Sequence, residues 1–199
     1  SVEDMRRIIT AYTERKRARN LMDFDDLLTC LLRVFEERPE AGKAVSERFE
    51  HVLVDEYQDT NLVQAHIIKH LSAAHGRVFA VGDDAQSIYS FRGANYKNIL
   101  QFQRDYPDAK IYKLETNYRS TPQVLALANE IMSATPEKFR KQLAPVKLPG
   151  EKPKFITCAN NEEQAQFVAE QILGLREDGV ALEDIGVLYR SHRNSLEIE

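Results

Sequence analysis

One stretch of this sequence decides the fold: His51-Val52-Leu53-Val54-Asp55-Glu56-Tyr57-Gln58-Asp59-Thr60. A short apolar run ends there on two adjacent carboxylates. Parallel strands that are buried on both faces have near-continuous Val and Leu, so residues 52–54 are expected to form such a strand. Ligands of open α/β sheets bind at the carboxyl ends of the strands, which is where Asp55 and Glu56 stand. The stretch therefore predicts an α/β fold with a binding site at this strand end.

The two carboxylates suit the hydrolysis of a nucleoside triphosphate. We expect Asp55 to hold Mg²⁺ through a water molecule, and Glu56 to orient and deprotonate the attacking water. The pattern is that of a Walker B strand. Taken alone, it fits equally well a strand that ends in a solvated acidic turn.

Two more apolar runs end in polar segments of the same kind. Val78-Phe79-Ala80-Val81 runs into Gly82-Asp83-Asp84-Ala85-Gln86-Ser87-Ile88-Tyr89-Ser90-Phe91-Arg92-Gly93-Ala94, and residues 110–114 run into Glu115-Thr116-Asn117-Tyr118-Arg119-Ser120-Thr121-Pro122. In form and spacing, the three segments resemble motifs II, III and IV of the UvrD/Rep/PcrA-like superfamily 1 DNA helicases. The resemblance also reaches residues 22–28 and 185–191, so it covers nearly the whole chain. It implies RecA-like parallel sheets with crossover helices, in parts of two motor domains.

The resemblance implies an ATP site between these motor domains. Gln86 would contact the γ-phosphate or the attacking water, Tyr118 would stack on the adenine, and Arg119 would reach the γ-phosphate from the second domain. A planar guanidinium suits that role because it spreads its charge over the phosphoryl oxygens. ATP and Mg²⁺ are thus the implied cofactors, and the implied catalytic residues are Asp55, Glu56, Gln86 and Arg119.

A second group of residues is expected to bind DNA, both single-stranded and partly duplex. Tyr89 and Phe91 lie two apart beside Arg92, and aromatic faces next to a cation hold single strands with little sequence preference. By resemblance, the two rings stack on bases and Arg92 meets the backbone. The family often has Trp where Phe91 stands, and a buried, structural role for Phe91 stays open. Gln58 and Asp59 would couple the two sites, although Asp59 could equally cap the helix that follows. Thr60 is the other residue predicted as that cap.

The phosphate-binding loop that such a motor needs does not occur in this sequence. That loop, G-x-x-x-x-G-K-[ST], holds the β- and γ-phosphates with backbone N–H groups and a lysine. The only Gly-Lys pair is Gly42-Lys43, which is followed by Ala44 and has Glu37 at the position of the first glycine. We therefore expect the chain to be an internal part of a larger helicase.

Two functions stay open. The first is part of an ATP-driven DNA helicase of repair or replication, moving 3′ to 5′ by resemblance, with a fused nuclease as a narrower possibility. The second is a degenerate module that binds DNA or protein without hydrolysis. The acidic pair together with Gln86 and Arg119 favours the first.

We expect three parts: a helical tail of an inserted subdomain at 1–20, the C-terminal half of the first motor domain at 21–115, and the start of the second at 116–199. Beyond the strands named above, hydrophobic periodicity and turn residues predict helices at 2–20, 23–37, 60–75, 121–134 and 162–177, and strands at 155–159 and 185–189. The acids Asp23, Asp25 and Asp26 are interpreted as the cap and first turn of the second helix rather than as metal ligands.

The composition is that of a soluble globular protein, with 43% hydrophobic and 29% charged residues. The net charge of −4 argues against a uniformly basic DNA-binding surface. The basic helix at 2–20 could contact DNA, but a solvated helix face is the favoured interpretation. Cys30 and Cys158 have no metal-binding spacing and are predicted to be reduced. No signal peptide or membrane-spanning run is evident, so we predict a cytoplasmic protein with no membrane partner.

Overall fold

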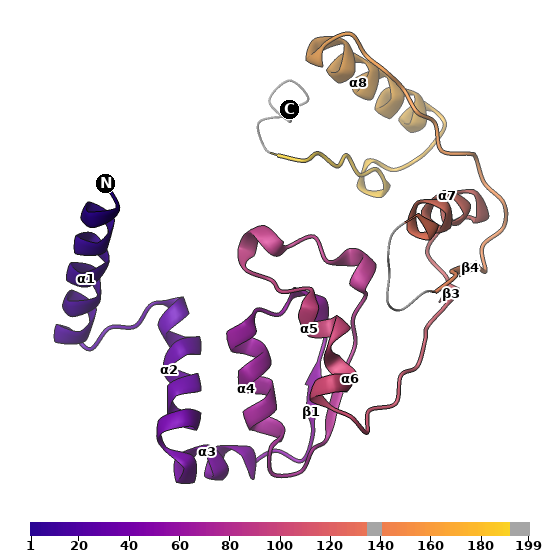
Figure 1. Ribbon diagram of the computed structural model, residues 1–199. Helices are drawn as coiled ribbons and strands as arrows, with labels where there is room; N and C mark the ends of the chain where they lie inside the picture. The colour runs from indigo at the N-terminus through magenta and orange to yellow at the C-terminus, as the bar shows by residue number, and fades with distance from the viewer. Residues whose placement is uncertain (135–140, 192–199) are drawn as a thin grey trace. The chain divides into compact units, whose positions relative to one another are not determined.

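The computed structural model describes residues 1–134 and 141–191. The chain divides into two compact units, Ser1–Leu148 and Pro149–Glu199 (Figure 1). The helices and strands of the first unit are α1 (Val2–Ala18), α2 (Phe24–Glu37), α3 (Pro39–Ser46), β1 (Val52–Val54), α4 (Leu62–Ser72), β2 (Val78–Ala80), α5 (Lys97–Leu100), α6 (Phe102–Asp105), β3 (Thr116–Asn117), α7 (Pro122–Ser133) and β4 (Ala144–Pro145). Short 3₁₀ turns follow β1 (η1, Tyr57–Asp59) and β2 (η2, Asp84–Gln86; η3, Ser90–Arg92). The second unit contains α8 (Asn161–Glu177) and the turn η4 (Leu182–Asp184).

The centre of the first unit is a β1-α4-β2 crossover, as predicted. The two strands pair in parallel, with Val52 opposite Val78 and Val54 opposite Ala80. Helix α4 begins at a capping box, in which the Asn61 side chain accepts from the Gln64 N–H and the Gln64 side chain accepts from the Asn61 N–H, both at 2.9 Å. The predicted caps, Asp59 and Thr60, were wrong by one or two residues.

The sheet is buried on one face only, which corrects the expectation of burial on both. Leu53 and Phe79 are register partners, and their side chains are 73% and 62% exposed. The flanking strand residues, whose side chains point to the other face, are half-buried, and α4 contacts β1. Continuous apolar sequence allows burial on both faces, but the described helices cover one.

Helices α2, α3 and α4 pack together into the main core of the first unit. Asp23 caps α2 together with Asp26, as predicted from the acidic run. Phe35 of α2 is 5% exposed, and its ring stacks on that of His70 at a centroid distance of 5.2 Å. Gly42 lies buried inside α3, where a Cβ would stand 3.1 Å from the Phe35 ring. The Gly42-Lys43 pair is therefore part of a packed helix and not of a phosphate loop.

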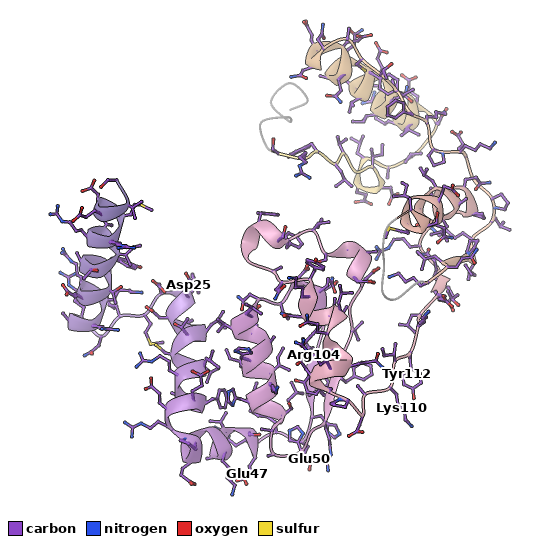
Figure 2. All side chains as sticks on the ribbon, viewed as in Figure 1. Asp25, Glu47, Glu50, Arg104, Lys110 and Tyr112 are labelled. Carbon is purple, nitrogen blue, oxygen red and sulfur yellow. The ribbon has the colours of Figure 1, made fainter. Side chains whose placement is uncertain are left out.

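Three predicted strands are wrong. Residues 110–114, 155–159 and 185–189 are not assigned to any strand, and the second sheet consists of the two-residue strands β3 and β4 paired in parallel. Figure 2 shows Lys110 and Tyr112 on the connecting segment, where the Tyr112 side chain is 79% exposed. Apolar, β-branched sequence favours an extended backbone, but a strand also needs a neighbouring chain for its hydrogen bonds. The helices α7 and α8 do match the predicted ones within a residue or two. Over the described residues, no helix is both long and apolar enough to cross a membrane.

Candidate functional site

The candidate site lies where β1 and β2 end. Backbone pairing continues past both strands, because the Val81 N–H donates to the Val54 carbonyl at 2.8 Å and the Tyr57 N–H donates to the Val81 carbonyl at 2.9 Å. Parallel strands end at the same edge of a sheet. The segment that begins at Asp55 therefore lies beside the segment that begins at Gly82, as the sequence predicted.

The two acids after β1 are both exposed, and the backbone at Glu56 is strained. Glu56 has φ 48° and ψ 44°, the left-handed conformation that residues with a Cβ adopt only at a cost. The Glu56 N–H donates to Asp55 Oδ1 at 2.9 Å, which fixes the Asp55 carboxylate at the strand end. Left-handed backbone in a non-glycine residue is concentrated at functional sites, so this turn is a candidate for one.

Gln58 joins the two segments through a buried amide. Its side chain is 1% exposed; Nε2 donates to Glu56 Oε2 at 2.6 Å and Oε1 accepts from the Asp83 N–H at 2.9 Å. Gly82 leaves the room for this, since a Cβ there would stand 2.7 Å from Gln58 Oε1. One side chain thus holds both the acid of the first segment and the backbone of the second.

Asp83 is the centre of a second group of contacts. Its Oδ1 accepts from the Ala85 N–H at 3.0 Å and from Lys141 Nζ, and its Oδ2 accepts from Gln86 Nε2 at 2.7 Å. Burial acts to raise the pKa of Asp83, but the hydrogen bonds from Lys141 and Gln86 outweigh it and hold the pKa below its ordinary value. The Gln86 amide is therefore held beside an ionised carboxylate.

Asn98 is a buried residue of this region that sequence reasoning missed. It lies on α5, is 7% exposed, and its Nδ2 donates to the Thr60 carbonyl at 3.0 Å and to Thr60 Oγ1 at 3.1 Å. Thr60 Oγ1 in turn donates to the Tyr57 carbonyl at 2.7 Å. Asn98 thus fixes the end of η1, and no local sequence signal marks this role because the residues to which its Nδ2 donates are 37 or 38 positions away in the sequence.

Asp59 is not a helix cap, because Asn61 has that role. The Oδ1 atom of Asp59 is buried and has no hydrogen-bond partner among the described residues. Buried carboxylate oxygens are normally paired, so an unpaired one indicates a position where a donor can bind. Tyr57 beside it is 2% exposed, and burial raises the pKa of its phenol to about 12.

The predicted DNA-binding aromatic residues are displayed on the surface. Tyr89 and Phe91 are 37% and 76% exposed, and their ring centroids are 5.9 Å apart. Phe91 is therefore not buried within the described part of this chain. Arg92 has described backbone within η3, while its side chain lies outside the described part of the structure.

Tyr118 and Arg119 lie on a turn that follows β3. Asn117 Oδ1 accepts from the N–H groups of Arg119 and Ser120, at 2.9 and 2.8 Å, and so shapes this turn. The side chains of Tyr118 and Arg119 are exposed. The hydrogen bond described for Arg119 joins it to Asn117 and not to the Gln86 group.

The basic helix α1 has no buried residue, as the interpretation of a solvated helix requires. Lys16 is the exception to full solvation. Its Nζ lies 2.6 Å from Asp23 Oδ2 and 2.5 Å from Asp26 Oδ2, so it binds the capping acids of α2. In the described part of the chain, no group of three or more His, Cys, Asp or Glu side chains could hold a metal ion.

Family models and relatives agree on what this chain is similar to. Residues 2–107 match the UvrD/REP helicase N-terminal domain, and residues 112–199 match the UvrD-like helicase C-terminal domain. The chain is 37% identical over 195 residues to the ATP-dependent DNA helicase PcrA of Staphylococcus aureus (strain Mu50), covering 96% of this chain and 27% of that protein. It is 39% identical over 196 residues to the ATP-dependent DNA helicase UvrD1 of Mycobacterium bovis, covering 94% of this chain and 25% of that protein.

The chain thus spans about a quarter of the length of the curated relatives it matches. Both halves match domains of one kind of helicase, in the order of the motifs found in the sequence. The chain belongs to the UvrD/Rep helicase family.

Proposed function

We propose that this chain is part of an ATP-dependent DNA helicase, a motor that couples ATP hydrolysis to 3′-to-5′ movement along single-stranded DNA and to duplex unwinding in repair or replication. The observation that carries the proposal is the buried Gln58 bridge. It holds Glu56, the candidate base, and the start of the segment that bears Gln86, Tyr89 and Phe91. A change at either segment is thereby transmitted to the other.

At the nucleotide side of this bridge, the Asp55 carboxylate suits Mg²⁺, which prefers oxygen ligands and is often held by one or two carboxylates plus phosphate oxygens and water. The cation would neutralise charge on the transferred phosphate when bound. Glu56 would accept the proton of the attacking water, and Gln86 would orient that water. Tyr118 would stack on the adenine, and Arg119 would stabilise the negative charge of the γ-phosphate.

At the DNA side, Tyr89 and Phe91 offer exposed ring faces for unpaired bases. Arg92 would bind the DNA backbone. Asp59, with its unpaired buried oxygen, is the second coupling residue beside Gln58. Backbone and stacking contacts of this kind would let the protein move along DNA of any sequence.

We also propose the domain division 1–20, 21–115 and 116–199. The two family models adjoin between residues 107 and 112, which supports a boundary close to residue 115. The division into compact units at Leu148 and Pro149 lies further along the chain. The proposed boundary between motor domains, near residue 115, therefore does not coincide with the boundary between the compact units.

A second candidate function is a module that binds DNA or protein without hydrolysis. The packed position of Gly42 against Phe35 favours it, because the chain's only Gly-Lys pair cannot cradle a phosphate there. The strained backbone of Glu56 favours hydrolysis, since a binding module has no use for an acid held in that way.

The deciding experiment is Glu56→Gln in the full-length protein, with ATP hydrolysis measured at saturating single-stranded DNA. We expect turnover to be lost while ATP binding is retained, because the amide keeps the shape but cannot accept a proton. Glu50→Gln is the matched control, since Glu50 is an exposed acid shortly before β1 (Figure 2). Near-normal turnover of the Glu56→Gln variant would remove Glu56 from the role of base, and an inactive wild type would favour the binding module.

A further inference from the structure

Lys141 makes an ion pair that connects distant parts of the chain. Its ammonium group binds Asp83 Oδ1 across 58 residues of sequence. Lys141 belongs to the residues that match the C-terminal helicase domain, and Asp83 belongs to those that match the N-terminal one. The pair therefore joins the two family domains at the carboxylate that holds Gln86.

The pair is partly buried, as are the pairs of Lys16, and so differs from the exposed lysine pairs of the chain. The side chains of Lys141 and Asp83 are 19% and 25% exposed, whereas those of Lys154 and Glu151 are 69% and 85% exposed. Partly buried charges are less screened by water and salt, and leaving one without its partner is costly. The Asp83 carboxylate is thus strongly biased toward the arrangement in which Lys141 binds it.

The segment that bears Lys141 is itself anchored. Asn129 of α7 donates from Nδ2 to the Leu143 carbonyl at 3.0 Å and accepts at Oδ1 from the Leu143 N–H at 3.1 Å. The Gln142 N–H donates to Glu115 Oε1 at 2.9 Å. Helix α7 follows directly on the turn that carries Arg119. Lys141 is therefore held by the same structure that presents Arg119.

The Asp83 carboxylate divides its two oxygens between distinct donors. Lys141 and the Ala85 N–H occupy Oδ1, and the Gln86 amide occupies Oδ2. Two donors on Oδ1 oppose rotation of the carboxylate, so Oδ2 is kept directed at Gln86. Without Lys141, the Ala85 N–H would be the one described donor left to hold Asp83 Oδ1 in place.

We propose that Lys141 is a positioning residue, which fixes the Asp83 carboxylate from the second family domain and thereby sets the position of the Gln86 amide. The role of Gln86 toward the nucleotide rests on the proposed function. The way in which Gln86 is held rests on the contacts alone. Movement of the Lys141 segment would shift the Asp83 carboxylate and, with it, the Gln86 amide.

The test of positioning uses this chain and the side-chain amide resonances of Gln86 in ¹⁵N–¹H spectra. In Lys141→Met we expect these resonances to shift toward those of a glutamine whose amide has no carboxylate partner, while Lys141→Arg retains most of the wild-type shift. Lys147→Met is the matched control, since Lys147 is exposed and six residues further along. Gln86 resonances that are identical in Lys141→Met and wild type would overturn the proposal, whether or not the protein hydrolyses ATP.

A second measurement tests the consequence in the full-length protein. Lys141→Met should lower kcat for ATP hydrolysis with little change in KM, and Lys141→Arg should restore most of it. Combined with Gln86→Ala, the Lys141→Met change should have little further effect, because both act through one side chain. Losses that multiply in the double variant would overturn the inference. A wild-type protein without hydrolysis would contradict the proposed function instead, and the spectra would still decide how Gln86 is held.

Discussion

Replacing Gly82 by alanine should destabilise the first unit of this protein. The added Cβ would stand 2.7 Å from Gln58 Oε1 and 2.7 Å from Ile99 Cδ1, where ordinary contacts lie at 3.4–4 Å. Gln58 cannot turn away freely, because it is 1% exposed and its amide is hydrogen-bonded at both ends. Relief of the overlap therefore requires the loss of a buried hydrogen bond or a shift of the backbone.

The size of the effect follows from these two costs. Overpacking of a filled site costs about 1–3 kcal/mol, and a buried polar group left without its partner costs about 1–3 kcal/mol. Together they predict a loss of about 2–6 kcal/mol. A small domain is stable by only about 5–15 kcal/mol, so the change should be evident in unfolding.

The assay is urea unfolding of this chain, followed by native-state hydrogen exchange at the buried α4 residues Ile67 and Ile68. Gly174→Ala serves as the matched control, because Gly174 lies within α8 and its added Cβ would contact nothing within 4 Å. That control should stabilise α8 by about 0.5–1 kcal/mol. In a Gln58→Ala background, the Gly82→Ala penalty should shrink, since one of the two overlapping groups is gone.

A Gly82→Ala variant whose free energy of unfolding lies within about 0.5 kcal/mol of wild type would refute the reasoning. It would mean that the Gln58 bridge can move aside without cost. The proposed coupling between Glu56 and Asp83 would then have no rigid link.

Three further predictions concern DNA, ATP and pH. In the full-length protein, Tyr89→Ala should weaken single-strand binding by about 1–3 kcal/mol, the value of one lost stack, in titrations at fixed salt; an unchanged affinity would mean the ring is structural. This chain by itself should show only background ATP hydrolysis with Mg²⁺ and single-stranded DNA, because it contains no phosphate-binding loop; turnover that disappears in Asp55→Ala would contradict this. The pKa of Asp83 lies below its unfolded value, so the stability from its ion pair is present above the unfolded pKa and lost as the pH falls through the folded pKa. Carboxyl NMR titration should show that pKa rise in Lys141→Met, and an unmoved pKa would argue against the pair in solution.

The helix starts show where local sequence was sufficient and where it was not. Asp23 and Thr121 precede α2 and α7 as predicted: Asp23 is followed by an apolar periodic run, and Thr121 is followed by Pro122, which favours the first helical position. Before α4, three adjacent residues could act as cap, and the sequence did not separate Asp59 and Thr60 from Asn61. The choice depends on where η1 ends, which Asn98 fixes through a bond to Thr60 from 38 residues away.

The strands show the same division. Residues 52–54 and 78–80 form the predicted parallel pair because α4 returns the chain to the same sheet. Residues 110–114, 155–159 and 185–189 have a similar apolar pattern, yet the described structure gives them no ladder partner. Exposure of Leu53 and Phe79 likewise depends on what covers the sheet and not on their hydrophobicity.

The sequence by itself determined the family, the crossover at the centre of the first unit and the residue types at the candidate site. These follow from motifs that are contiguous in the sequence and from the number of residues between them. Only the tertiary structure decided how those residues are held. The Gln58 bridge, the ion pair of Lys141 and the bond from Asn98 to Thr60 each join residues that are at least 25 positions apart. Such contacts depend on burial and on the close approach of two backbones, which no local pattern of residues specifies.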